Sequence, residues 1–205
     1  MTERKFKPER TMIAVKSESI QRHLIGEFIA KFEKRGLKMI ACKLLAPNAE
    51  LIGQHYADDE EWYISSGTKT RANYEAKGEE NLLEPAEYGK LTREKLMDSL
   101  CDRPILAMVW SGPHAIALGR KTAGATNPLI ADIGSIRGDY SSDSYEMSDE
   151  TGRAIQSLVH ASGSVDEAER EIALWFKPEE ILDYDLVMED VFYSHDWGRV
   201  KKTSN

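Results

Sequence analysis

One histidine stands at the end of an apolar run in the segment IQSLVHASGSVDEAEREIALWF, residues 155–176. This residue is His160, and Ser162 and Ser164 place hydroxyl groups two and four residues after it. Gly163 lets the backbone turn close to a ligand, and a helix that begins after Ser164 would turn its first amide groups toward an anion. A histidine beside such a site can act as a general base or as a nucleophile. A lone histidine beside apolar residues is more often structural, so the segment by itself leaves both interpretations open.

Three basic residues, Lys16, Arg120 and Arg137, stand at the ends of predicted elements beside apolar runs. Each of them alone is more often a solvated charge. Arg137 lies between glycines in the segment GSIRGD, where the backbone can approach a ligand closely. The glycine-rich segments lack the G-x-x-x-x-G-K-S/T spacing of a P-loop, and the sequence has no catalytic loop of the protein-kinase type.

The elements that must position these residues are predicted from hydrophobic periodicity. Residues 11–16 and 37–45 are predicted strands. Residues 19–36 carry apolar side chains at helical spacing, which predicts one helix that Ser19 caps and Gly36 stops. The chain therefore begins with a β-α-β unit.

The middle of the chain is polar and helix-prone from residue 49 to residue 99. We interpret it as helices and loops on the outside of the domain, with breaks at Gly67, Gly78, Pro85 and Gly89.

The last part of the chain returns to apolar runs. Residues 104–118 hold two runs around Ser-Gly-Pro, which predicts a β-hairpin. A short helix is expected within 119–128, a loop-rich stretch over 133–153, and a last apolar run over 154–162. Ser164 and Glu167 then fit a capping box, and the helix that follows has an apolar stripe made by Ala168, Ile172, and Trp175 or Phe176.

This order of elements predicts an α+β fold. We expect a single domain over residues 1–205, built on a ferredoxin-like antiparallel or mixed βαββαβ sheet with helices packed on one face. An inserted helical segment is expected at about 65–99.

Composition and charge narrow the class of protein. The chain of 205 residues is 41% hydrophobic and 30% charged, which is ordinary for a soluble globular protein. Its net charge of −8 argues against broad nucleic-acid binding but leaves room for a small basic pocket. Cys42 and Cys101 lie among apolar residues and are expected to be buried thiols in a reducing compartment. The N-terminus lacks a secretory pattern and no run approaches a membrane span, so we expect a cytoplasmic protein.

Five blocks in order resemble the nucleoside diphosphate kinase family: ERTMIAVKSESIQR, QHYADDEEW, GRKTAGATNP, GSIRGDY and LVHASGSVDEAEREIALWF. The last block is the most specific, because it matches the family's active-site histidine signature from His160 to Ile172. The resemblance covers roughly residues 9–62 and 100–184. It implies a ping-pong transfer of the γ-phosphate of a nucleoside triphosphate, typically ATP, to a nucleoside diphosphate through a phosphohistidine.

The resemblance also implies roles for individual residues. His160 would be the nucleophile through Nδ1 of its neutral ring, Glu171 would accept a hydrogen bond from the other ring nitrogen, and Ser162 would bond near that glutamate. Lys16 and Tyr56 would contact the phosphate that moves. The implied nucleotide-binding residues are Lys16, Arg120, Thr126, Arg137 and Ser157 for phosphate and sugar, and Trp62 for stacking on the base.

Three positions depart from the family pattern. The usual Lys-Pro-Asp reads Lys16-Ser17-Glu18 here, and the usual asparagine three residues before the histidine is Ser157, which has less reach. The aspartate that usually follows the active-site serine is Gly163. We therefore expect Mg²⁺ to be held mainly by the nucleotide's own phosphates, and we name no protein metal ligand.

Two functions stay open on the sequence. The leading one is an active kinase with a helical insertion, and the alternative is a catalytically impaired nucleotide-binding regulatory protein on the same fold. Ser17, Ser157 and Gly163 favour the alternative. The resemblance also implies a homo-oligomer (hexamer, tetramer or dimer), which the sequence does not resolve.

The inserted segment and the other histidines receive modest expectations. The insertion is expected to be a solvated decoration, a longer lid or a modifier of the oligomer interface. His23, His114 and His195 are expected to be structural or solvated, and His55 only to cap a helix.

Overall fold

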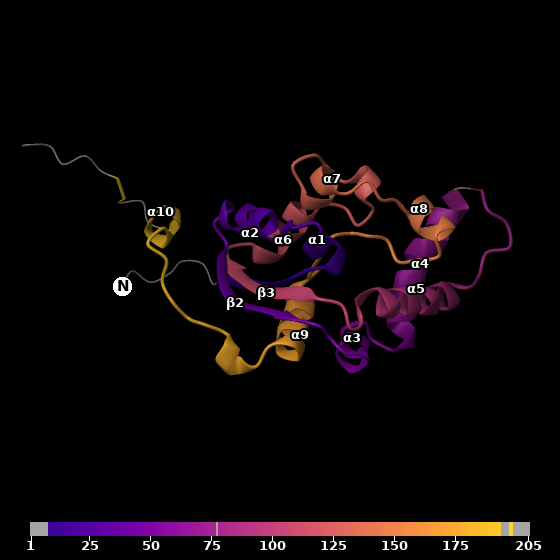
Figure 1. Ribbon diagram of the computed structural model, residues 1–205, viewed down its shortest axis with the longest axis horizontal. Helices are drawn as coiled ribbons and strands as arrows, with labels where there is room; N and C mark the ends of the chain where they lie inside the picture. The colour runs from indigo at the N-terminus through magenta and orange to yellow at the C-terminus, as the bar shows by residue number, and fades with distance from the viewer. Residues whose placement is uncertain (1–7, 77, 194–196, 199–205) are drawn as a thin grey trace, which may run out of the picture.

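The computed structural model describes residues 8–76, 78–193 and 197–198. In this part of the chain four strands form one sheet in the order β2-β3-β1-β4, and all three pairings are antiparallel (Figure 1). The predicted ferredoxin-like α+β fold is confirmed. The strands are β1 (Glu9–Val15), β2 (Lys38–Leu45), β3 (Ile105–Gly112) and β4 (Val159–Ala161).

Helices cover both faces of the sheet, not one face as predicted. Ile13 and Val15 of β1 pack toward α2 (Ile25–Glu33) and α6 (Ala115–Ala123). The alternate residues of β1 belong to a second cluster with α3 (Ala49–His55) and α9 (Val165–Trp175), on the opposite face in Figure 1. β3 is buried along its whole length, so its run of apolar residues reflects a strand covered on both sides.

The first predicted helix is divided into two. α1 (Ser17–Gln21) ends before a turn in which His23 has a φ of +58°, and α2 begins at Ile25. Ser19 does not cap a helix, because it is buried inside α1 and its hydroxyl donates to the Leu158 carbonyl at 2.8 Å. Gly36, with a φ of +78°, follows α2 as the predicted stop.

The polar middle of the chain forms a hairpin of two long helices, α4 (Glu60–Ala76) and α5 (Pro85–Leu100). Gly67 and Gly89 lie inside these helices and do not break them, contrary to the prediction. A Cβ atom on Gly67 would lie 1.6 Å from the Pro85 carbonyl oxygen, and one on Gly89 would lie 2.1 Å from that of Tyr63. Both glycines are therefore needed where the two backbones touch.

The predicted β-hairpin at 104–118 is wrong. β3 ends at Gly112, and residues 115–118 begin α6. A short apolar run fits a buried strand and a buried helix equally well by periodicity, and here it begins a helix that packs on β1. The stretch 133–153, predicted as loop, holds two short helices, α7 (Ile136–Tyr140) and α8 (Tyr145–Glu150). The short 3-10 helix η1 (Pro128–Ile130) precedes them.

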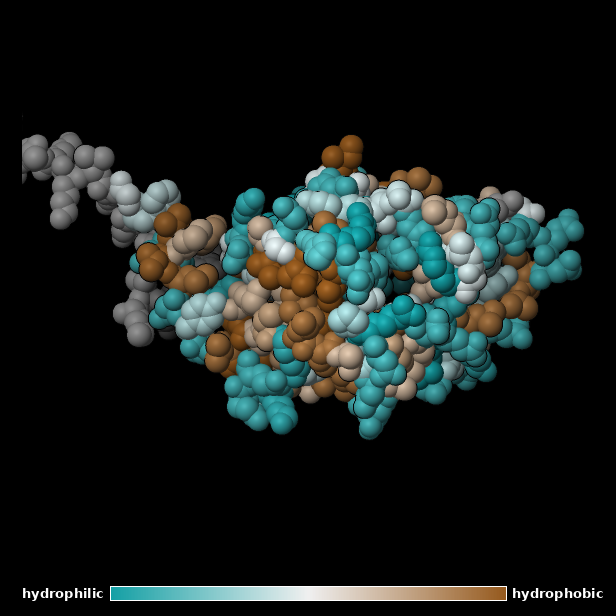
Figure 2. Space-filling model, in the orientation of Figure 1, coloured by the Kyte–Doolittle hydropathy of each residue, from teal (hydrophilic) through white to brown (hydrophobic). Residues whose placement is uncertain are grey.

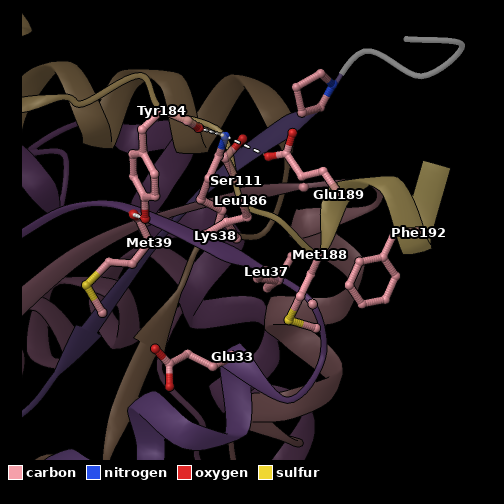
Figure 3. Close-up of a pocket in the computed structure, with 13 residues that line it drawn as sticks. Glu33, Leu37, Lys38, Met39, Ser111, Tyr184, Leu186, Met188, Glu189 and Phe192 are labelled. Carbon is pink, nitrogen blue, oxygen red and sulfur yellow. Dashed lines mark hydrogen bonds and ion pairs between the residues drawn. The ribbon is translucent and has the colours of Figure 1, made fainter. Parts of the chain in front are cut away.

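After α9 the chain runs back along the free edge of β2 through η2 (Pro178–Glu180) to α10 (Glu189–Tyr193). The Leu182 amide donates to the Ile40 carbonyl at 2.8 Å, and Lys38 forms an ion pair with Glu189 at 2.9 Å. Between this segment and the sheet lies a cavity of about 340 Å³ (Figure 3). Tyr184 and Glu189 lie on either side of the Lys38 side chain, and Met188 and Phe192 lie farther along the lining. Among the described residues that line it, Lys38 is the one cation and is already paired with Glu189, and the third charged residue is Glu33. It is therefore not the candidate for phosphate chemistry.

Several smaller expectations can be checked against the fold. The prediction of buried thiols is wrong. Cys42 is exposed because alternate residues of the edge strand β2 face outward, and Cys101, directly after α5, is half-buried. His195 and residues 1–7 lie outside the described residues. No helix in the described part of the chain is both long and apolar enough to span a bilayer.

Candidate active site

The helix after His160 begins as its sequence indicates. Ser164 is the N-cap of α9, and its hydroxyl accepts a hydrogen bond from the Glu167 amide at 3.1 Å. The Glu167 carboxylate accepts from the Gly163 amide at 2.8 Å, one residue before the partner that a capping box uses. β4 and α9 thus hold His160 and Glu171 on either side of a tight turn.

Glu171 lies directly behind the ring of His160. Its Oε1 is 2.9 Å from His160 Nε2, a hydrogen-bond separation without a hydrogen bond's alignment. The glutamate side chain is 1% exposed and the histidine side chain 18% exposed, and Nε2 is fully buried. A carboxylate beside Nε2 favours a proton on that nitrogen, so Nδ1 keeps its lone pair.

Ser162 holds the second carboxylate oxygen. Its hydroxyl donates to Glu171 Oε2 at 2.6 Å and accepts from the Met12 amide of β1 at 3.1 Å. Burial alone would raise the pKa of Glu171, but the opposing charges and hydrogen bonds of its neighbours lower it below the ordinary value. The carboxylate is therefore a buried anion fixed to the central sheet.

A second histidine, which the sequence did not single out, adjoins this pair. His55 is 5% exposed at the end of α3, and its Nδ1 accepts a hydrogen bond from the Trp175 indole at 3.2 Å. Its Nε2 is 3.7 Å from Glu171 Oε1, and its ring lies 4.7 Å from that of His160 in a T-shaped contact. Burial and the neighbouring His160 lower the pKa of His55 from 6.5 to about 3. His55 was expected only to cap a helix, but the structure places it beside Glu171 and His160.

His55, His160 and Glu171 bring three possible metal ligands within 4.8 Å of one another. They fit a metal poorly. The indole of Trp175 can only donate, so His55 Nδ1 carries no proton and the neutral ring must carry its proton on Nε2. That nitrogen has no lone pair for a cation, so we assign no resident metal to this cluster.

Lys16 and Ser157 meet at the end of β1. The lysine is 7% exposed, and its Nζ donates to the Ser157 hydroxyl at 2.9 Å. Burial lowers the pKa of Lys16. Serine is shorter than the asparagine of the family pattern, but it still reaches the lysine.

Arg137 of α7 is 3% exposed and ties together the backbone beside His160. Its Nε donates to the Ser157 carbonyl at 2.9 Å and its Nη2 to the Val159 carbonyl at 2.6 Å. Burial, followed by the charge of Arg120, lowers the pKa of Arg137 to about 10, so it remains a cation at neutral pH. The guanidinium has five N–H donors, and the contacts with protein leave some of them for a ligand.

The residue that joins Ser157 to β4 has a strained backbone. Leu158 has a φ of +66°, which is rare for a bulky residue. Its amide donates to Glu18 Oε1 at 3.1 Å, and its carbonyl accepts from the Lys16 amide at 3.0 Å. Glu18, one of the departures from the family pattern, therefore supports the segment that carries His160.

One cavity of about 500 Å³ joins these residues. Eight of the ten predicted site residues line it, and Ser162 and Glu171 lie behind His160. Near its mouth are Arg120 and Thr126, which are exposed, and Trp62, whose ring lies 5.9 Å from that of Tyr56. The eight lining residues are Lys16, Tyr56, Trp62, Arg120, Thr126, Arg137, Ser157 and His160.

The cavity is basic although the chain is acidic. Among the described residues that line it, six are lysine or arginine and two are aspartate or glutamate, in a chain whose net charge is −8. The acidic pair does not form a free carboxylate cluster, because Asp149 lies 3.6 Å from Lys95 and Glu167 accepts from the Gly163 amide. The cavity is therefore suited to an anionic ligand with several charges.

The helical hairpin forms one wall of this cavity, which the sequence did not reveal. One face of α4 contributes Ser66, Lys69 and Asn73, and α5 contributes Thr92 and Lys95. In Figure 1 the hairpin stands beside α8, and the ion pair between Lys95 and Asp149 of α8 joins the two. The helical segment is thus part of the cavity wall and not only a solvated decoration.

Comparisons with known proteins agree on one family. The family model described as nucleoside diphosphate kinase matches residues 9–69 and 80–181. A nucleoside diphosphate kinase of Pyrobaculum aerophilum is 40% identical over 180 residues, which span 85% of this chain and 98% of that protein. One of Schizosaccharomyces pombe is 37% identical over 185 residues, which span 90% of this chain and 97% of that protein.

Solved structures give the same result. The crystal structure of an NDP kinase from Pyrobaculum aerophilum has a TM-score of 0.82 and 38% identity, and the match covers 86% of this chain and all of that one. The nucleoside-diphosphate kinase of Borrelia burgdorferi, solved as a transition-state mimic with bound vanadate and ADP, has a TM-score of 0.75 and 31% identity. That match covers 91% of this chain and 98% of the other.

Proposed function

This chain belongs to the nucleoside diphosphate kinase family, and from that premise we propose that His160 carries the phosphoryl group between nucleotides. Members of the family move the γ-phosphate of a nucleoside triphosphate to a nucleoside diphosphate. In the proposed ping-pong cycle, His160 Nδ1 is phosphorylated first and gives up the phosphoryl group second.

One observation carries this proposal. The basic cavity of an acidic chain ends at a partly exposed histidine whose Nε2 is buried against Glu171. A ring fixed by Nε2 presents Nδ1 as its free nucleophile, and the surrounding cations attract the phosphates. A regulatory protein that only binds nucleotides would not require a nucleophile oriented in this way, so the arrangement favours the kinase.

In each half of the cycle one bond to phosphorus forms and one breaks. The lone pair of Nδ1 forms a bond to the γ-phosphorus while the bond from that phosphorus to the β–γ bridging oxygen breaks, and the diphosphate leaves with the electron pair. A terminal β-phosphate oxygen of the acceptor then attacks the same phosphorus, and the pair of the N–P bond returns to Nδ1. The proton on Nε2 stays beside Glu171 throughout, so the carboxylate balances the positive charge that develops on the ring.

The remaining residues would bind and position the phosphates. We assign Lys16 and Tyr56 to the phosphoryl group that moves, since both line the cavity beside His160. Fixed donors of this kind stabilise the charge of the transition state, where most of the catalytic effect arises. We further assign Arg120, Thr126, Arg137 and Ser157 to the phosphates and sugar, and Trp62 to the base.

Mg²⁺ is proposed to arrive with the nucleotide. Mg²⁺ prefers oxygen ligands and usually keeps waters and substrate phosphates. The two carboxylates that line the cavity in the described part of the chain already have protein partners. The ion would neutralise phosphate charge, while the residues of the chain bind and orient the nucleotide.

We also propose that the protein works as a homo-oligomer in the cytoplasm. Leu129, Ile130 and Ile133 are 69%, 71% and 94% exposed in one short segment, and hydrophobic side chains stand out beside α7 at the upper margin of Figure 2. Such a patch supports burial against another copy. Two free cysteines, one of them exposed, suit a reducing compartment. Light scattering at several concentrations would distinguish hexamer, tetramer, dimer and monomer.

A two-step labelling assay tests the function. The protein is incubated with Mg²⁺ and γ-labelled ATP, isolated, and given unlabelled GDP. We expect acid-labile label on the protein that then moves to GTP, no label on His160→Ala, and normal label on His23→Asn. The control is matched because His23 is exposed and its positive φ is tolerated by asparagine. Nucleotide binding without any label on the wild type would favour the regulatory protein.

A further inference from the structure

We propose that His55 is a positioning residue for the proposed reaction: with its proton fixed on Nε2 by Trp175, it keeps Glu171 facing His160. The inference rests on the function proposed above for His160. It assigns a task to a buried histidine that is not among the described residues lining the cavity and that was expected only to cap a helix.

The tautomer of His55 follows from its partners. The Trp175 indole is a donor only, and it donates to His55 Nδ1 at 3.2 Å. Nδ1 must therefore supply a lone pair, and the single proton of the neutral ring sits on Nε2. That N–H group lies on the side of Glu171 Oε1, 3.7 Å away.

The carboxylate of Glu171 then has polar neighbours on both oxygens. Ser162 holds Oε2, while His160 and His55 both approach Oε1. The separation to His55 exceeds a hydrogen-bond length, so its contribution is the dipole of a fixed N–H group and the packing of its ring. The T-shaped contact of the two imidazoles, at 4.7 Å, also restricts rotation of the His160 ring.

His55 can perform this task only as a neutral group. A cation there would compete with His160 for Glu171 and would repel the charge that develops on the phosphorylated ring. Protonation of Nδ1 would break the bond from Trp175, and burial opposes the charge. The groups that face His55 are His160 from β4, Glu171, Arg170 and Trp175 from α9, Lys16 after β1, and the adjacent Tyr56.

Two substitutions separate positioning from packing. His55→Gln places an uncharged amide donor near the position of Nε2, and His55→Leu fills similar space without a donor. The rate of phosphohistidine formation is measured in a single turnover with ATP and Mg²⁺, over pH 5.5 to 8.5. We expect His55→Leu to be slower by about tenfold, equivalent to roughly 1.4 kcal/mol, and His55→Gln to recover most of that loss.

Two further measurements, the pH dependence of the rate and the tautomer of His55, would be unaffected if His55 had a merely structural role. With ¹⁵N-labelled histidine, NMR is expected to show His55 unprotonated at Nδ1 across this range, and Trp175→Phe is expected to remove that preference and add an acid limb to the rate profile. Circular dichroism and thermal unfolding report whether each variant folds.

Three results would overturn the inference: equal rates in the wild type and both His55 variants, equal losses in both variants, or a protonated Nδ1 in the wild type. Absence of label on the wild type would instead reject the proposed function, so the two failures are distinguishable.

Discussion

Lys16 Nζ lies 2.9 Å from Ser157 Oγ, although the two residues are 141 positions apart in the sequence. The contact lies in a part of the cavity wall where both side chains are buried. It shows that the shorter serine still meets the lysine that the resemblance assigns to phosphate binding, and it makes this pair the first target for mutation.

Replacing Ser157 with alanine is expected to lower kcat/KM by about tenfold, because Lys16 loses the bond that orients its ammonium group. Steady-state kinetics with ATP and a nucleoside diphosphate measures the effect. Ser148→Ala is the matched control, since Ser148 is buried and lines the same cavity, and its hydroxyl donates to the carbonyl of Tyr145 at 3.2 Å. Equal effects of the two changes would show that the lysine contact has no special part.

Removing a positive charge from the hairpin wall is expected to weaken nucleotide binding more than turnover. For Lys69→Ala we expect KM to rise by about threefold with kcat nearly unchanged, because Lys69 lines the cavity and attracts phosphate charge. Lys90→Ala removes the same charge from the same hairpin but outside the cavity lining. A KM that rises equally in both variants would point to a general effect of net charge.

The close contact of α4 and α5 predicts a large effect of a single methyl group. Gly67→Ala is expected to destabilise the protein by about 2 kcal/mol or more, because the added carbon would lie 1.6 Å from a backbone oxygen. Gly26→Ala, in α2 with open space around it, is expected to be neutral or stabilising. Chemical denaturation of both variants gives the comparison, and a Gly67→Ala protein as stable as the wild type would show that the helices can separate at low cost.

His55 also predicts how stability depends on pH. Its pKa in the folded protein is about 3 against 6.5 for the free side chain, so between these values the unfolded chain binds a proton that the folded protein excludes. Its contribution is fully present above pH 6.5 and is lost as the pH falls toward 3, by about 2 kcal/mol at pH 5. Denaturant unfolding of the wild type and His55→Gln at pH 7 and pH 5 should therefore show a smaller loss in the variant. Parallel losses would mean that His55 is already charged in the folded protein.

Much of the site could be predicted because its parts are local in sequence. His160, Ser162 and Glu171 fall within twelve consecutive residues, so the turn at Gly163 and the cap at Ser164 suffice to bring them together. The remaining phosphate-binding candidates were named from short blocks that resemble a known family. His55 lies in the block QHYADDEEW, directly before Tyr56, but a role only as a helix cap was expected for it. The hairpin wall could not be indicated, because the segment 65–99 lies outside the blocks that resemble the family.

The prediction of the fold rested on the same local patterns and failed where those patterns were too short. The period of apolar residues located β1, β2 and α9, and it failed for residues 115–118, where a run too short to show its period became a helix packed on β1. The single helix predicted for residues 19–36 is interrupted at a turn in which His23 has a φ of +58° and the Leu24 amide donates back to the Ser19 carbonyl at 3.0 Å.

The sequence by itself determined the family, through short blocks that resemble its members. It also determined the α+β sheet and the local structure around His160, because periodicity, caps and turns act over a few neighbouring residues. Only the tertiary structure decided that α4 and α5 form a wall of the cavity and that His55, 120 positions before Trp175, has its tautomer fixed by that indole. Such contacts arise from the packing of whole elements, in which a buried polar group takes the partner that the fold brings to it.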